Sequence, residues 1–145
     1  MRYEESSLTL PLGLIVVMIC ILIEIYSVTL PYVTYGKVDV YIKEDIWMLF
    51  MMLLSISLSI CSILLGCKGV NPTPLIVLSA STDLLNALYV LTSIRYYIML
   101  GPGFMFTITS ALLKGAACLM ITLNVGELEV KIIEKIEELE PGERF

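Results

Sequence analysis

The sequence predicts an all-α membrane protein. Four transmembrane helices form a bundle, with a small β-hairpin in the first outer loop and an amphipathic cytoplasmic helix at the C-terminus. Of the 145 residues, 58% are hydrophobic, whereas a soluble domain is about half apolar. Charges are nearly absent from four runs of about 20 residues, a helical length that matches the hydrocarbon core of a bilayer. The runs are residues 10–30, 46–66, 75–94 and 104–125. We interpret residues 1–125 as a four-helix transmembrane domain.

The first run is expected to be a spanning helix rather than a cleaved signal peptide. Its apolar stretch is long, and no small-x-small cleavage site follows it. Pro11 lies in a first helical turn, where a missing N–H is tolerated. Pro31 is expected to end the helix.

The first outer loop, residues 31–45, predicts a β-hairpin. It is rich in valine, tyrosine and isoleucine, and Tyr35-Gly36-Lys37 is a plausible turn. A two-stranded hairpin is marginal alone, so it should rest on the helices or on a partner. Asp45 is placed to cap the next helix, and Trp47 to lie at a membrane interface.

Two stripes of small residues predict close helix–helix contacts. Small side chains let helices approach each other in lipid, and hydroxyl groups can form hydrogen bonds across the contact. Each stripe has a spacing of three or four, which places its members on one face of a helix. The second helix carries Ser55, Ser59, Ser62 and Gly66, and the fourth carries Thr107, Ala111 and Gly115.

Two opposite charges are expected to pair inside the bundle. Asp83 and Lys114 lie about 12 and 15 Å along adjacent helices from the cytoplasmic end. An unpaired charge at that depth costs about 2.5–3.5 kcal/mol. Ser79 and Asn86 share a helix face with Asp83, and Ser110 lies one turn before Lys114. We expect Asn86 and Ser110 to add hydrogen bonds to the ion pair.

Glu24 is a third charge within a predicted span. Three environments are compatible with its position about 9 Å from the outer end of its helix. It could join Lys114, meet a descending Arg95, or remain protonated.

The acidic tail, residues 126–145, predicts an amphipathic helix. Its seven glutamates outnumber its three basic residues, Lys131, Lys135 and Arg144, and this negative charge disfavours docking on anionic lipid. An apolar stripe at helical spacing predicts a partner-binding face, formed by Leu128, Ile132, Ile133, Ile136 and Leu139.

The arrangement of basic residues places both termini in the cytoplasm, and we expect a multi-pass protein of the plasma membrane. Lys37, Lys43 and Arg95 belong to the outer side. The other face of the membrane carries more of them: Arg2, Lys68, Lys131, Lys135 and Arg144. Charge carried by Glu and Lys, together with the absence of glutamine, favours a thermophilic source.

The composition argues against several functional classes. The chain has no histidine, which removes the usual ligand of haem and zinc and the usual general base. Its four cysteines form no C-x-x-C motif and are expected to be small, buried and reduced. No phosphate-binding loop, nucleophile–base set or basic patch for nucleic acid is present. We therefore expect no cofactor, no metal site and no enzymatic activity.

Two families offer partial resemblances. Glu24 in the first of four helices resembles the proton and cation site of small multidrug exporters, although this chain adds a longer first loop, Lys114 and an acidic tail. The four-span outline, with a β-rich first outer loop, resembles claudin-like proteins. The Trp-Gly-Leu-Trp and paired-cysteine loop pattern of that family is missing here. The second likeness therefore covers topology alone.

Two functions follow from these patterns. The first is a structural or accessory subunit of a larger membrane assembly, with the lipid bilayer and other membrane subunits as its partners. The alternative is a small transporter or an ion or proton channel that uses Asp83, Lys114 and Glu24. A transporter needs a hydrated path to these residues, whereas an accessory subunit needs a dry, packed bundle.

Overall fold

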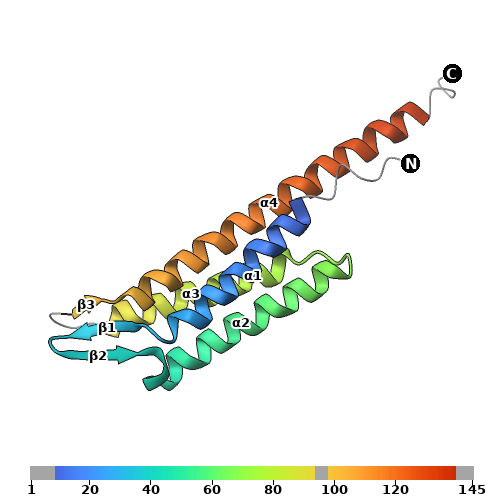
Figure 1. The fold of residues 1–145 in the computed structure, drawn as a ribbon. Coiled ribbons are helices and arrows are strands. Elements are labelled where there is room, and N and C mark those ends of the chain that lie inside the picture. Colours follow the sequence, from blue (N-terminus) through green and yellow to red (C-terminus); the bar gives the residue numbers. More distant parts are fainter. Residues whose placement is uncertain (1–8, 94–97, 140–145) are drawn as a thin grey trace.

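The computed structural model describes residues 9–93 and 98–139, with side chains described for 10–93 and 99–123. Its helices lie side by side in an elongated bundle, with a small sheet at one end (Figure 1). The sheet lies at the opposite end from the start of the first helix and the end of the last (Figure 1). The elements in chain order are α1 Thr9–Ser27, β1 Pro31–Tyr35, β2 Val38–Tyr41, η1 Ile42–Glu44, α2 Ile46–Cys67, α3 Thr73–Ser93, β3 Ile98–Leu100 and α4 Pro102–Leu139.

Within residues 9–93 and 98–139, four helices are long and apolar enough to cross a membrane. The qualifying segments are Leu10–Ser27, Ile46–Cys67, Thr73–Ser93 and Pro102–Leu123. Their large apolar side chains point outward: Leu22, Leu112 and Leu123 are 65%, 69% and 70% exposed. Within these segments Glu24, Asp83, Lys114 and several serines are buried instead, the reverse of a water-soluble protein. This distribution fits helices that are surrounded by lipid.

The predicted hairpin is present and belongs to a larger sheet. β1 and β2 pair antiparallel around a turn at Gly36, whose φ of 61° favours glycine. β3 pairs with the other edge of β1, which gives the strand order β2-β1-β3. No strand is predicted from the sequence between the spans at 75–94 and 104–125. Three residues are too short to give a clear period-two pattern.

Gly101 fixes the sheet to the start of α4. Its N–H donates to the Tyr32 carbonyl at 2.9 Å. A Cβ atom at Gly101 would lie 2.1 Å from the Pro31 carbonyl oxygen, so no larger residue fits there. Glycine therefore allows the backbone before α4 to lie directly on β1.

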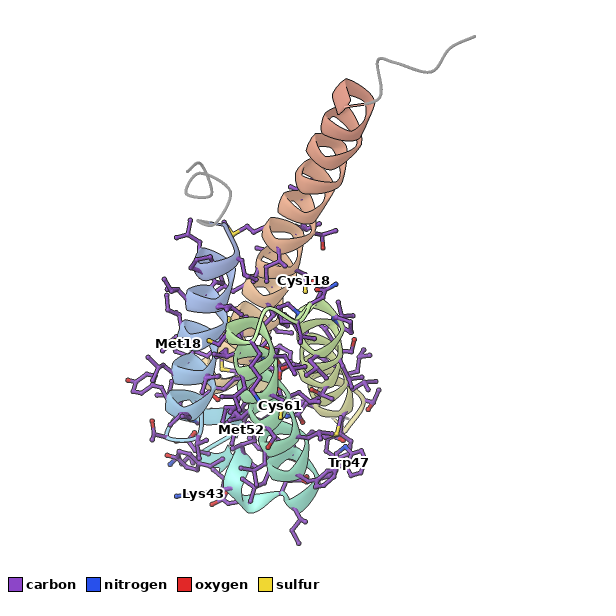
Figure 2. The ribbon with its side chains drawn as sticks, turned by 90° about the vertical axis from the view of Figure 1, so that its right-hand side faces the viewer. Met18, Lys43, Trp47, Met52, Cys61 and Cys118 are labelled. Carbon is purple, nitrogen blue, oxygen red and sulfur yellow. The ribbon has the colours of Figure 1, made fainter. Side chains whose placement is uncertain are left out.

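The Asp45 cap predicted for α2 is confirmed. Its Oδ1 accepts from the N–H groups of Trp47 at 2.9 Å and Met48 at 3.2 Å. Its Oδ2 accepts from the Tyr89 hydroxyl at 3.1 Å, which links the start of α2 to the end of α3. Lys43 and Trp47 lie at the sheet end of the bundle, whereas Cys118 lies toward the other end (Figure 2).

The fourth helix differs from the prediction in its length. The sequence analysis separated a span at 104–125 from a tail helix beginning at 126, but α4 is continuous from Pro102 to Leu139. A single glycine, Gly126, costs about 1 kcal/mol in a helix, which the strong helix formers that follow it can offset. The last part of α4 projects beyond the other helices (Figure 1). The predicted partner-binding side chains of Leu128, Ile132, Ile133, Ile136 and Leu139 lie outside the described side chains.

The cysteines also depart in part from expectation. All four are free, and Cys20 and Cys118 are buried as expected. Cys61 and Cys67 are exposed on α2, so the prediction that they would be buried is wrong.

Two apolar clusters lie toward the two ends of the bundle. In α3 and α4 the buried polar residues fall between the members of these clusters along the chain: Ser79 and Asp83 lie between Ile76 and Ala87, and Ser110 and Lys114 lie between Phe104 and Ala117. The polar residues therefore form one layer at the middle of the bundle. The cluster at the sheet end contains Tyr32, Ile42, Met48, Met52, Ala87, Val90 and Phe104, and the other contains Val17, Ile76, Ala117, Cys118 and Ile121.

A buried ion cluster as the candidate functional site

Lys114 is the centre of the polar layer. The residue is 0% exposed, although lysine is almost never fully buried without a partner. Its Nζ donates to a Glu24 oxygen, to Asp83 Oδ2 at 2.7 Å, and to the hydroxyls of Ser55 and Ser79, both at 2.8 Å. An ammonium has three N–H donors. These four acceptors therefore use its whole hydrogen-bonding capacity.

All four helices contribute to this site, which we call the ion cluster. It consists of Glu24 from α1, Ser55 from α2, Ser79 and Asp83 from α3, and Ser110 and Lys114 from α4. Each residue lies on the inward face of its helix, because the neighbouring buried residues recur at spacings of three and four. The cluster therefore ties the helices together at a single level.

Serine side chains allow α2 and α3 to approach closely beside the ion cluster. The Ser79 hydroxyl lies 2.9 Å from the Ser55 hydroxyl and 2.8 Å from that of Ser59. A further bond joins the Ser79 hydroxyl to the Ser55 carbonyl at 2.9 Å. Hydroxyl groups on small side chains are typical of helix contacts in membranes.

Glu24 is bound through only one of its two oxygens. Oε1 accepts from the Ser110 hydroxyl at 2.6 Å and from Lys114. Oε2 is buried and has no hydrogen-bond partner among the described residues, and the residue as a whole is 1% exposed. A buried carboxylate oxygen without a partner is costly, because the water that it loses is not replaced.

The ion cluster contains more acid than base. Glu24 and Asp83 are two carboxyl groups, and both pair with the single ammonium of Lys114. Fully ionised, the three groups would carry a net charge of about −1 inside the bundle, where charge is poorly screened. This surplus distinguishes the site from a simple salt bridge.

The structure brings together most of the polar residues that the sequence singled out. Lys114 contacts both Asp83 and Glu24. Glu24 therefore joins Lys114, the first of the three environments considered for it. Arg95 lies outside the described residues. Asn86 does not join the ion pair as expected. Its Nδ2 donates to the Met48 carbonyl at 3.3 Å, and its Oδ1 has no partner. The side chain lies one helical turn nearer the sheet, within reach of the α2 backbone.

Sequence reasoning assigned Ser55 to helix packing and missed its contact with Lys114. Counting residues from the helix ends could have found it, because Ser55 lies at a depth similar to that of Asp83. The other stripe residues Ser59, Ser62, Thr107 and Ala111 are buried, and a Cβ at Gly66 would meet Leu14 at 2.8 Å. Gly115 differs: it is exposed, and a Cβ there would meet nothing within 4 Å. The buried face of α4 contains Lys114 rather than Gly115.

Tyr32 is part of the buried core at the sheet end of the bundle. It is 0% exposed, and its hydroxyl donates to Thr107. Thr107 donates in turn to the Gly103 carbonyl at 3.3 Å. Burial raises the pKa of the Tyr32 phenol well above its ordinary value. The neutral hydroxyl therefore stays in place as a donor over a wide pH range.

The ion cluster is poorly suited to nucleophilic catalysis. Serine beside lysine can form a catalytic pair only when the amine is free to accept a proton. Here Lys114 forms two ion pairs, and Ser55 and Ser79 are 0% exposed. Among the residues that the structure describes, no group of three or more His, Cys, Asp or Glu side chains could hold a metal ion.

A scan against protein-family models found no match to this chain, and neither did a search of curated proteins.

Proposed function

We propose that this protein is a non-enzymatic, multi-pass membrane protein that acts as a structural or accessory subunit of a larger membrane assembly. The observation that carries the proposal is the closed ion cluster. Lys114, Glu24 and Asp83 are 0%, 1% and 3% exposed, and they join three helices through ion pairs. Such a bundle holds a fixed shape and offers no polar group of the cluster to a soluble substrate.

Two surfaces are available to partners. One is the sheet end, where Met99 is 76% exposed and Ile46 is 87% exposed. The other is the projecting end of α4, whose sequence from Gly126 to Leu139 combines an apolar stripe with five glutamates. An isolated amphipathic helix in water would leave its stripe exposed, so a protein partner is the favoured occupant. We place this end in the cytoplasm and the protein in the plasma membrane.

The test is purification from the native membrane in mild detergent, followed by identification of the proteins that accompany it. Deletion after Gly126 should leave the four spans inserted and remove those partners. The matched variants are Ile132→Ser with Ile136→Ser, which should release partners, and Glu134→Gln with Glu138→Gln, which should keep them. If the truncated chain retains the same partners in the same amounts, the assignment of α4 as the interaction helix is wrong.

A second candidate is a small transporter or an ion or proton channel. It is favoured by one observation, the unpartnered Oε2 of Glu24 beside a surplus carboxyl group. Flux of protons or monovalent cations into liposomes that contain the purified chain would test it. Transport that is lost in Glu24→Gln but kept in Asp39→Asn, a change at an exposed carboxylate, would favour this function over the structural one.

A further inference from the structure

We infer that the ion cluster is a proton-binding site, in which Glu24 and Asp83 share one proton at neutral pH. The inference concerns the state of the folded bundle and goes beyond the structural role proposed above, which needs no titratable group. It rests on three observations: the number of acids and bases, their burial, and one carboxylate oxygen without a partner.

The charge balance requires one additional positive charge. The cluster has two carboxyl groups and one ammonium, all at most 3% exposed. A net negative charge in such a site is unfavourable, and buried acids relieve it by taking up a proton. One proton makes the cluster neutral, with one carboxylic acid, one carboxylate and one ammonium.

The groups around the carboxyl pair supply no other counter-charge among the described side chains. Facing Glu24 are Cys20 from α1, whose thiol donates to the Ser110 carbonyl at 3.7 Å, and Lys114 from α4. Asp83 is the acid from α3. α2 contributes only the neutral Ser55 and Ser59, and β1 contributes the neutral phenol of Tyr32.

The hydrogen bonds favour a proton over a metal cation. Oε2 of Glu24 has no partner, whereas Oε1 already accepts two donors. A proton needs only one carboxyl oxygen, and by removing the negative charge it lowers the cost of leaving Oε2 buried without a partner. A sodium-sized ion would need several oxygen ligands, and the hydroxyls of Ser55 and Ser79 are already bound to Lys114 and to each other. Because the two acids interact through one ammonium, the proton belongs to the pair rather than to either residue.

Proton release on unfolding tests the inference in the full-length purified chain. A free carboxyl group is ionised at neutral pH, so unfolding with SDS in weakly buffered solution should release about one proton per chain. Glu24→Gln and Asp83→Asn should each release close to none, because one carboxylate then balances Lys114. Asp39→Asn is the matched control, since this exposed carboxylate should not change the count.

Infrared spectroscopy of the folded wild-type protein gives a second, independent readout that needs no variant. The carbonyl band of a protonated carboxylic acid should be present at neutral pH, shift in heavy water and disappear at higher pH. If the wild type shows no such band and releases no proton, the inference is wrong. Loss of the band on adding sodium chloride at constant pH would also overturn it, because the site would then prefer a metal cation.

Discussion

Replacement of Lys114 should destabilise the bundle far more than replacement of either of its acidic partners. Lys114→Met removes a donor from four oxygens and leaves two carboxyl groups without a counter-charge. Asp83→Asn instead leaves the Lys114–Glu24 pair intact, and its amide oxygen can still accept from the ammonium. The order of the two effects follows from the surplus of acid.

The magnitudes can be worked from these contacts. Removing one partner of a buried ion pair costs about 3–5 kcal/mol, because the charge left behind is uncompensated. Asp83→Asn weakens one hydrogen bond to a charged group, worth about 1.5–3 kcal/mol, and Glu24 remains as the counter-charge of Lys114, which limits that loss. We expect a loss of about 4 kcal/mol for Lys114→Met and under about 2 kcal/mol for Asp83→Asn.

The assay is reversible unfolding in mixed micelles with increasing SDS, followed by circular dichroism. The triple variant Glu24→Gln, Asp83→Asn, Lys114→Met serves as the control. It removes every charge of the cluster and should recover part of the stability that Lys114→Met alone loses. Equal losses for the two single variants, or a loss under about 1 kcal/mol for Lys114→Met, would refute the central place given to this residue.

Three further predictions concern other parts of the chain. Gly101→Ala should disrupt the sheet and lower stability in the same unfolding assay, because its Cβ would overlap the β1 backbone. Gly115→Ala should be neutral or stabilising by up to about 1 kcal/mol, because a Cβ there meets nothing within 4 Å. The free energy of unfolding should fall above about pH 10, because Tyr32 ionises there in the unfolded chain while its raised pKa keeps it neutral in the fold. A similar fall in Tyr32→Phe would contradict this. In a cysteine-free background, single cysteines at Lys37 and Glu143 should label from opposite sides of sealed cells, and labelling from one side would overturn the count of four spans.

Much of the fold could be predicted because its signals are local. Apolar runs of bilayer length, the Asp45 cap and the turn at Gly36 each depend on neighbouring residues alone. β3 could not be found in this way. It forms because Gly101 brings a short segment against β1, a contact between parts of the chain about 70 residues apart.

The ion cluster was predictable in its members but less so in its contacts. Depth along each helix, counted from the sequence, brings Asp83 and Lys114 to one level. The rotation of each helix about its own axis is set by packing, so the sequence could not choose between partners for Glu24. It also could not show that Asn86 reaches the α2 backbone or that Gly115 faces outward.

The continuity of α4 connects the ion cluster mechanically to the projecting end of the helix. At about 1.5 Å per residue the helix is about 57 Å long, and about 38 Å of it separates Lys114 from Leu139. Lys114 fixes the angle of α4 about its axis, because its ammonium is held from three sides. An unbroken helix carries that angle to its far end. Any event at the ion cluster that rotates α4 about its axis would therefore rotate the projecting end by the same angle.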